Sequence, residues 1–455
     1  MGQRPARRLA STSLDPRPPM TDQAPAIEGS ASVSERGSMG HLLWFFALVY
    51  VVEGLGQIGG LISQPLNYYL KQVQGWTPLQ ITAYLTLFNL PWIIKPLYGL
   101  VSDFIPLFGY RRKSYLLIAN AAATCGFLLV TQLTVPDRLV FALMLTAYAM
   151  AISSTLCGAV LVENGQRLKE SGTFINQQWL WYNIAAMTAA ILGGQLVQRL
   201  PPTAALHSAA ALVSCAPLLV IFGTVFLIPE KKARMNIQGM KHTFEGLSST
   251  FRRRHLWIIA AFIFLYYFSP GLSTPLYFIM TDNLKFSQAY IGFLGSLAGA
   301  GWVAGAFLHR WYLKKLTLKK LLNVSIAIGT LASLAFLFFW NEATAAIISF
   351  SSGLTAMIAT VATLTLAADY CPRRAEGFAF AVLMSIINLA TALADNLGSY
   401  LFTDVFHRNL SPLVVLSAAF TAFAFVLVPL LHLGHKLQGD PAANGALTPP
   451  PPDTR

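Results

Sequence analysis

The sequence predicts an all-α protein whose twelve transmembrane helices form two groups of six, and three observations support this class. Of the 455 residues, 55% are apolar and 11% are charged, whereas a soluble domain carries about 25% charged residues. The chain contains twelve apolar stretches near the roughly 20 residues that a helix needs to cross a bilayer. A polar, basic stretch over residues 229–255 separates the first six from the last six. A soluble globular protein is therefore excluded.

We number the twelve segments in chain order and expect a helix in each. They cover residues 41–61, 79–100, 114–131, 139–161, 177–198, 207–228, 256–280, 289–311, 321–340, 344–367, 376–401 and 411–433. These bounds predict an N-terminal half over residues 39–228 and a C-terminal half over residues 256–433, joined by the basic linker 229–255. Residues 1–38 and 434–455 are rich in Pro and polar residues, so we expect two disordered tails.

The lysines and arginines predict that both termini are cytoplasmic, because basic residues stay on that side during membrane insertion. Of the 32 Lys and Arg residues, 26 fall in the tails and the even-numbered loops and 5 in the odd-numbered loops, each loop taking the number of the segment before it. The net charge of +13 is therefore loop charge and does not indicate nucleic-acid binding. We expect a multi-pass protein of the inner, cytoplasmic cell membrane, in contact with the lipid bilayer.

An internal repeat relates the two halves. Four residues between segments 4 and 5 recur between segments 10 and 11 at a constant offset of 206, namely Glu163 and Asp369, Arg167 and Arg373, Glu170 and Glu376, and Phe174 and Phe380. Two six-helix halves related by a parallel repeat are the architecture of the major facilitator superfamily, whose substrate site lies between the halves. The sequence therefore predicts the major facilitator fold.

Charged residues at the cytoplasmic helix ends predict a gate. Asp103 ends segment 2 and is followed by Arg111 and Arg112, so the acid can sit against the positive N-terminus of a helix from the other half. Such a latch must break when the protein opens inward. The expected gate comprises Asp103, Arg111, Arg112, Glu163, Arg167, Asp369, Arg373 and Glu376. The alternative is that these charges only hold the loops in the cytoplasm or cap helices.

Away from the segment ends, three ionisable residues fall within the segments, Glu53 in segment 1, Lys95 in segment 2 and Asp395 in segment 11. Each costs roughly 2.5–3.5 kcal/mol to place in lipid, so each is expected to face protein or a water-filled cavity. On straight helices Glu53 is about 18 Å and Lys95 about 8 Å from the cytoplasmic end, at 1.5 Å per residue. This difference argues against a direct pair. We expect Lys95 to meet Glu163, Glu376 or an anionic substrate, with a structural ion pair as the alternative.

Polar and aromatic side chains follow the same segments. The expected substrate and proton pathway comprises Glu53, Gln57, Asn89, Trp92, Lys95, Tyr266, Asn388 and Asp395. Trp92 is expected either to stack on a planar ring or simply to pack against its neighbours. Pro270 and Pro275 in segment 7 are typical of a broken helix that lets a gate bend.

Motifs of other function classes are missing from the sequence. It contains no GxxxxGKS/T, HExxH or GxSxG pattern, so neither an ATP-driven pump nor a common intramembrane hydrolase is predicted. We expect no enzymatic activity, no cofactor and no metal site. Secondary transport of a small molecule is the function class that is left.

Three stretches carry closely spaced Pro, Gly, aromatic and basic residues. They are LPWIIKPLYGLVSDFIPLFGYRRKSYLL (residues 90–117), AADYCPRRAEGFAFAVLMSIINLA (residues 367–390) and NYYLKQVQGWTPLQI (residues 67–81). All three resemble the folate–biopterin transporter family of the major facilitator superfamily. By this resemblance, family motif positions are occupied by Lys95, Asp103, Arg111, Arg112, Glu163, Glu376 and Asn388. The chain departs from the family in segment 4, where residues 157–159 are Cys, Gly and Ala and lack a common extra aspartate.

The resemblance implies a secondary active transporter that moves a folate or pterin-like organic anion by alternating access, with protons as the expected coupling ion. The alternatives are a permease for another organic anion, of the muropeptide or acyl-CoA type, and a non-transporting membrane protein that keeps the fold. Glu53 is the expected proton carrier because it is the only acid near the middle of segment 1, and Asp395 is the second candidate. Glu53 is otherwise expected to hydrogen-bond neighbouring helices or the amino-pyrimidine edge of a pterin.

Overall fold

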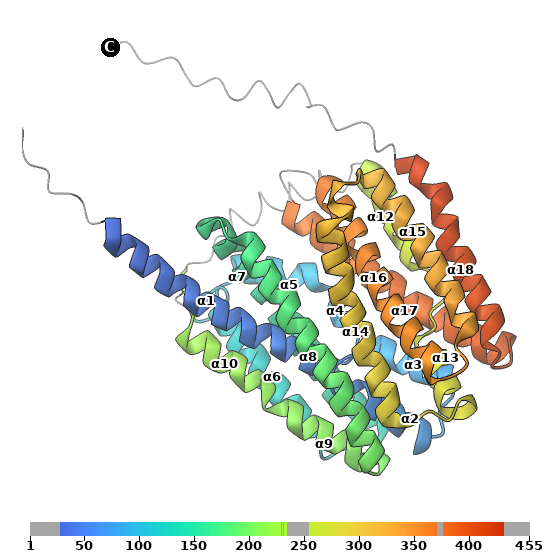
Figure 1. Cartoon of the computed structure of the whole chain (residues 1–455). Coiled ribbons are helices and arrows are strands. Elements are labelled where there is room, and N and C mark those ends of the chain that lie inside the picture. Colours follow the sequence, from blue (N-terminus) through green and yellow to red (C-terminus); the bar gives the residue numbers. More distant parts are fainter. Residues whose placement is uncertain (1–27, 229, 231, 234–253, 371–375, 432–455) are drawn as a thin grey trace, which may run out of the picture. The chain divides into compact units, whose positions relative to one another are not determined.

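The computed structural model describes residues 28–228, 230, 232–233, 254–370 and 376–431 (Figure 1). Within these residues the regular structure is helical, apart from one isolated bridge between Leu107 and Tyr110. The chain divides into two compact units, Met1–His41 and Leu42–Arg455, and the packing described below belongs to the second unit. The predicted all-α class is confirmed.

Helices fill both expected halves. The N-terminal half contains α1 (Glu28–Gly56), α2 (Ser63–Gln72), α3 (Pro78–Leu87), α4 (Leu90–Ile93), α5 (Lys95–Phe104), α6 (Lys113–Val130), α7 (Pro136–Leu168), α8 (Ser171–Arg199), α9 (Pro202–Ser214) and α10 (Ala216–Phe226). The C-terminal half contains α12 (Arg254–Tyr267), α13 (Ser273–Phe278), the π-helix η1 (Ile279–Asn283), α14 (Gln288–Trp311), η2 (Leu313–Lys315), α15 (Leu318–Ala335), η3 (Phe336–Phe338), α16 (Glu342–Tyr370), α17 (Glu376–Tyr400), the π-helix η4 (Leu401–Val405), α18 (Leu410–Leu427) and η5 (Val428–Leu431).

The first helix begins earlier than the sequence predicted. α1 starts at Glu28, whereas we expected segment 1 to start at residue 41 and residues 1–38 to be disordered. The helical part of this expected tail contains no proline, because Pro25 is the last one before Pro65, so nothing in it blocks helical hydrogen bonding. The structure places residues 28–38 in α1, and the extent of the expected disordered tail stays a prediction.

Three of the twelve expected segments are divided into shorter helices. Segment 6 is divided only at Cys215, between α9 and α10. Segment 2 is interrupted before α4 and again before α5, and Pro91 and Pro96 lie in the first turns of these two helices, where a missing N–H is tolerated. Segment 7 is interrupted at Pro270, between α12 and α13. Ten helices within the described residues are long and apolar enough to cross a membrane. The count of twelve spans stays a prediction, since segments 2 and 7 are not among these ten.

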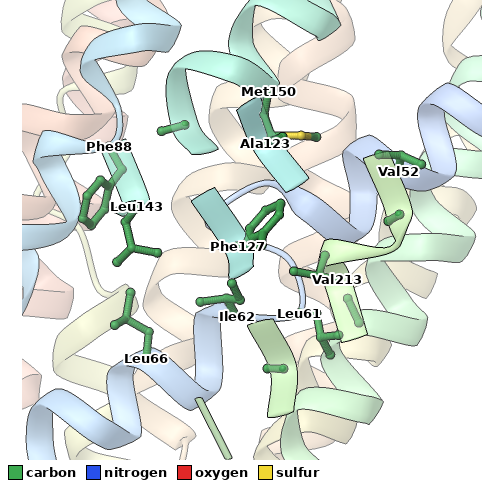
Figure 2. Packing of buried hydrophobic residues seen from close by; sticks show 14 of the residues in the cluster. Val52, Leu61, Ile62, Leu66, Phe88, Ala123, Phe127, Leu143, Met150 and Val213 are labelled. Atoms are coloured by element: carbon green, nitrogen blue, oxygen red, sulfur yellow. The ribbon is translucent and has the colours of Figure 1, made fainter. Parts of the chain in front are cut away.

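Buried apolar side chains form two clusters. The larger one lies mainly in the N-terminal half, where Figure 2 shows Ile62, Leu66, Phe127 and Leu143 packed among the helices. The smaller one lies in the C-terminal half and includes Tyr266. Each half therefore has apolar packing of its own.

The two halves meet along two lines of contact. At the first, which we call the α8–α14 seam, α8 packs against α14, and the two helices run side by side in Figure 1. Glycines allow this close approach, because a Cβ atom on Gly194 would lie 3.0 Å from the Cα of Gly292. At the second, the α17 seam, α17 packs against α3, α4 and α5. The fold predicts a substrate site between the halves, and we expect it in the region between these two seams.

Candidate functional site

A chain of polar contacts joins Glu53 on α1, Ser154 on α7 and Lys95 at the start of α5. The Ser154 hydroxyl donates a hydrogen bond of 2.8 Å to Oε1 of Glu53 and accepts one of 3.0 Å from Nζ of Lys95. The Lys95 ammonium also lies 4.1 Å from the centre of the Trp92 ring, a favourable cation–π distance. One hydroxyl thus links an acid and a base that share no direct ion pair among the described contacts.

The Glu53 carboxylate is only partly satisfied by this chain. Its second oxygen, Oε2, is buried and has no hydrogen-bond partner within the described part of the protein. A buried charge without full pairing is costly. Glu53 therefore carries one free acceptor position, which a proton, a water molecule or a ligand donor can fill.

One of the two acids that we expected to meet Lys95, Glu163, is not its partner. Lys95 contacts Ser154 and Trp92, whereas Glu163 is bound by Arg112. The reason is depth, because α5 continues to Phe104 and places Lys95 nine residues, or about 14 Å, before the helix end rather than about 8 Å. The side chain of the other expected partner, Glu376, lies outside the described residues.

Gln57 lies just after the C-terminal end of α1, and its amide donates a hydrogen bond to the hydroxyl of Tyr182 on α8. Tyr182 in turn makes an edge contact with Trp179. Trp179 stacks on Trp302 of α14, with ring centroids 6.0 Å apart. Gln57 is thus connected through α8 to the α8–α14 seam.

A cavity of about 540 Å³ lies between the halves and is lined by residues of both. This volume falls within the range of about 300–1,000 Å³ that small-molecule sites occupy. Hydroxyl and amide groups such as Thr86, Asn89 and Ser273 line it together with apolar side chains, and Asp395 is the one Asp or Glu among its lining residues. Two of the expected pathway residues, Asn89 and Asp395, are therefore brought to one cavity.

Hydrogen bonds cross the α17 seam beside this cavity. The Asn388 amide donates a bond of 3.1 Å to the backbone carbonyl of Trp92, and the Asn396 amide donates to Thr86. The Thr82 hydroxyl makes contacts of 2.7 Å with Ser399 and 2.8 Å with Thr274. Asn388 thus joins the halves through the same residue that lies under the Lys95 ammonium.

Tyr266 is separated from the other expected pathway residues. It is buried in the smaller apolar cluster, where its hydroxyl donates a bond of 3.3 Å to Ser325 of α15 and its ring stacks on Phe262. It is not among the residues that line the 540 Å³ cavity. Its placement supports a packing role, and the expectation of a pathway role is wrong for this cavity.

Arg112 holds the expected gate together, but within one half. Its guanidinium donates to Asp103, to Glu163 at 2.8 Å and to Ser102, and the Arg112 side chain is only 7% exposed. Phe108 and Gly109 have positive φ angles of 52° and 83°, which reverse the chain so that Arg112 returns to Asp103. Asp103 therefore meets Arg112 of its own half. Its expected contact with a helix N-terminus of the other half stays a prediction, because residues 371–375 before α17 and the first side chains of α17 lie outside the described residues.

The remaining gate residues divide into two groups. The Arg111 side chain is exposed, and Arg167 donates a bond of 2.8 Å to Asn164 rather than to an acid. The side chains of Asp369, Arg373 and Glu376 lie outside the described residues, so their part of the gate stays a prediction.

Glu230 is a residue of this region that the sequence analysis missed. Its carboxylate accepts hydrogen bonds from the backbone N–H groups of Arg111, Arg112 and Lys113, at 2.8, 3.0 and 2.8 Å. An acid is favoured at the positive N-terminus of a helix such as α6. The available signal was an isolated acid directly after segment 6.

Lys71 and Asp282 form a second missed feature, an ion pair between the halves. Lys71 on α2 binds Thr281 and Asp282 of η1, and its ammonium lies 4.4 Å from the centre of the Phe278 ring. Burial lowers the pKa of Lys71, while the hydrogen bond and charge of Asp282 oppose that shift. The signal was a lone basic residue in an odd-numbered loop, where the sequence carries few.

A glutamine cluster adds to the contact between the halves near this ion pair. The Gln64 amide donates to the backbone carbonyl of Gln288 at 2.8 Å, and Gln198 accepts from the Gln288 backbone N–H at 2.9 Å. The Tyr277 hydroxyl donates to the Gln288 side chain at 3.3 Å. We call the ion pair and these glutamines together the far-end contacts, since they lie at the end of the helices opposite Arg112.

Comparison with known proteins gives one family. The model of the BT1 family matches residues 55–445. The folate-biopterin transporter of Synechocystis sp. is 28% identical over 413 residues, which cover 86% of this chain and 81% of that protein. Folate transporter 2 of Plasmodium falciparum is 24% identical over 429 residues, which cover 89% of this chain and 91% of that protein.

Solved structures share the fold at low sequence identity. The nucleoside transporter NupG has a TM-score of 0.63 and 13% identity, over 87% of this chain and 98% of its own. The D-xylose-proton symporter has a TM-score of 0.63 and 13% identity, over 86% of this chain and 96% of its own. The predicted major facilitator fold is confirmed.

The Arg112 cluster gives a prediction about stability. Arg112→Gln removes the cation that Asp103 and Glu163 share, so two neighbouring acids are left to repel each other. We expect the Tm of the purified protein in detergent to fall by at least about 2–4 °C, the effect of roughly 1 kcal/mol in a large domain. Arg111→Gln is the matched control, because its side chain is exposed and its backbone bond to Glu230 is kept. Equal melting of the two variants would contradict a structural role for this cluster.

Proposed function

The chain belongs to the BT1 family, and from this premise we propose that it is a secondary active transporter of a folate or pterin-like organic anion. The fold and the family make it a multi-pass membrane transporter and not an enzyme. The family match spans both halves, so it includes every residue of the cavity and of the Glu53–Ser154–Lys95 chain except Glu53 itself, which lies two residues before the match begins.

The names of the relatives support the proposed substrate. The Synechocystis protein is named a folate-biopterin transporter and the Plasmodium falciparum protein a folate transporter. Both alignments cover more than four fifths of this chain. A folate or a pterin is therefore the first substrate class to test.

The contacts between the halves support transport by alternating access. The far-end contacts hold the halves together at one end, through Lys71 with Asp282 and through Gln64 with Gln288. They are polar bonds near the protein surface, where the Asp282 side chain is 41% exposed, and a typical bond of this kind contributes only about 0.5–1.5 kcal/mol. In this proposal they break when that end opens to admit or release substrate.

The charge distribution supports an orientation for the proposed transporter. The end that carries Arg112 is rich in Lys and Arg, and 26 of the 32 basic residues fall in loops and tails expected at that end. By the positive-inside rule we place that end, with both termini, in the cytoplasm of a cell membrane. The far-end contacts then form the outer gate.

Protons are the proposed coupling ion, with Glu53 as their carrier. Its free oxygen Oε2 is buried beside a serine hydroxyl that also contacts Lys95. Protonation of Glu53 would remove the negative charge that balances Lys95, which would free the ammonium for an anionic substrate. The same two residues would in this way couple the proton to the charge of the substrate.

The substrate is tested by uptake into proteoliposomes. Labelled folate and pterin are compared with a nucleoside, a muropeptide and an acyl-CoA, each with and without an inwardly directed proton gradient. We expect accumulation of folate or pterin above empty liposomes, and competition by the unlabelled compound. Uptake of a muropeptide or acyl-CoA without competition by pterins would show that the substrate class is wrong.

The proton role of Glu53 is tested by Glu53→Gln, which keeps the bond from Ser154 but cannot take up a proton. We expect loss of uptake driven by a proton gradient, with exchange of labelled for unlabelled substrate kept, because exchange needs no net proton movement. Glu342→Gln is the matched control, since Glu342 is exposed at the start of α16. Full retention of gradient-driven uptake, or loss of substrate binding itself, would contradict the assignment.

A further inference from the structure

The 540 Å³ cavity presents hydrogen-bond acceptors that have no donors. Asp395 of α17 lines it, and no described residue donates a hydrogen bond to its carboxylate. Asn67 of α2 lines the same cavity, and its side-chain oxygen Oδ1 is buried without a partner. An acceptor left unpaired away from bulk water costs about 1–3 kcal/mol. Within the described residues, neither of these two acceptors has a donor.

Neighbouring polar groups of the cavity are already paired with one another. The Gln64 amide is bound to Gln288, and Thr86 accepts from Asn396. Thr82 and Thr274 share a bond of 2.8 Å. These groups satisfy each other, whereas the Asp395 carboxylate accepts no hydrogen bond from a described residue.

The charged residues that line the cavity determine which part of a substrate it favours. Its lining contains one carboxylate and no Lys, Arg or His. A carboxylate repels the acidic groups of an organic anion and favours N–H donors, which it accepts on both oxygens. Apolar and aromatic lining residues, among them Tyr277, Ile291 and Phe336, offer surfaces for the faces of a flat ring.

The Asp395 carboxylate is confined on the side away from the cavity. It lies against Gly271 in the break between α12 and α13, where a Cβ atom would overlap the carboxylate. The Gly271 backbone N–H donates to the carbonyl of Ala394 at 2.9 Å and not to the carboxylate. The interruption of segment 7 therefore fixes this acid without pairing it.

We propose that Asp395 binds the amino-pyrimidine edge of the substrate, by accepting hydrogen bonds from a ring N–H and its adjacent exocyclic amino group. This proposal rests on the proposed function, because it assigns the pterin ring to the cavity. The acidic tail of a folate then extends away from Asp395, since the two negative charges repel each other.

Binding measurements on two probes test this assignment without depending on proton coupling. The first probe is 6-hydroxymethylpterin, and the second is its analogue in which a methyl group replaces the 2-amino group. Isothermal titration of the full-length protein in detergent at pH 7 gives an affinity for each. We expect the wild-type protein to bind the amino compound at least about tenfold more tightly, because the methyl compound leaves the acid without one donor.

Two variants test whether Asp395 causes the preference for the 2-amino compound. In Asp395→Asn we expect the ratio of the two affinities to fall to within about twofold, because a neutral amide replaces the carboxylate. Asp404→Asn, the same change at an exposed position of η4 outside the cavity, is expected to keep the wild-type ratio. Retention of the preference in Asp395→Asn would overturn the proposal.

If Asp395→Asn does not fold, the affinities of the wild-type protein for the two probes still test the Asp395 assignment. Equal affinity for the two probes would overturn the Asp395 assignment while leaving a pterin transporter in place. Binding of neither probe would overturn the proposed substrate class, and the Asp395 assignment with it. The two failures are therefore distinguishable.

Discussion

The balance of charge between Glu53 and Lys95 is the constraint on which the central part of this structure depends. A single charge buried among apolar helices is unstable, whereas two opposite charges with a shared hydrogen-bonding group can be accommodated. Ser154 provides that group through bonds of 2.8 and 3.0 Å. This arrangement requires Lys95 to start a new helix after the interruption of segment 2, which also turns Trp92 toward the ammonium. The broken helix is thus part of the site.

The halves are joined by polar bonds and close helix contacts as well as by the larger apolar cluster, which includes buried residues of both halves. Glycines bring α8 and α14 together, and side-chain hydrogen bonds such as that from Asn388 to Trp92 cross the α17 seam. The ion pair of Lys71 with Asp282 closes the far end. Contacts of this kind have small net energies and can be exchanged for contacts with water. A protein whose halves must separate and rejoin at each end needs such an interface.

The sequence predicted what depends on composition and period. Hydropathy gave the helical segments, Pro270 gave the break in segment 7, and the offset of 206 residues gave the two halves. The depth of a side chain along its helix and the identity of its partner were harder to predict, because both depend on where a helix bends. A straight segment 2 placed Lys95 near the surface, and the positive φ angles of Phe108 and Gly109, which bring Arg112 back to Asp103, were not predicted. The partner of Lys71 lies more than 200 residues away, so no local pattern revealed it.

The most direct test of the balance between Glu53 and Lys95 is a double-mutant cycle on the Tm of the purified protein. Lys95→Met alone leaves the Glu53 carboxylate buried beside a neutral group, and Glu53→Gln alone leaves the ammonium unbalanced. The account predicts that the double variant is more stable than Lys95→Met, with a coupling energy of at least about 1 kcal/mol between the two sites. If the two substitutions lower the stability by amounts that simply add in the double variant, the account is contradicted.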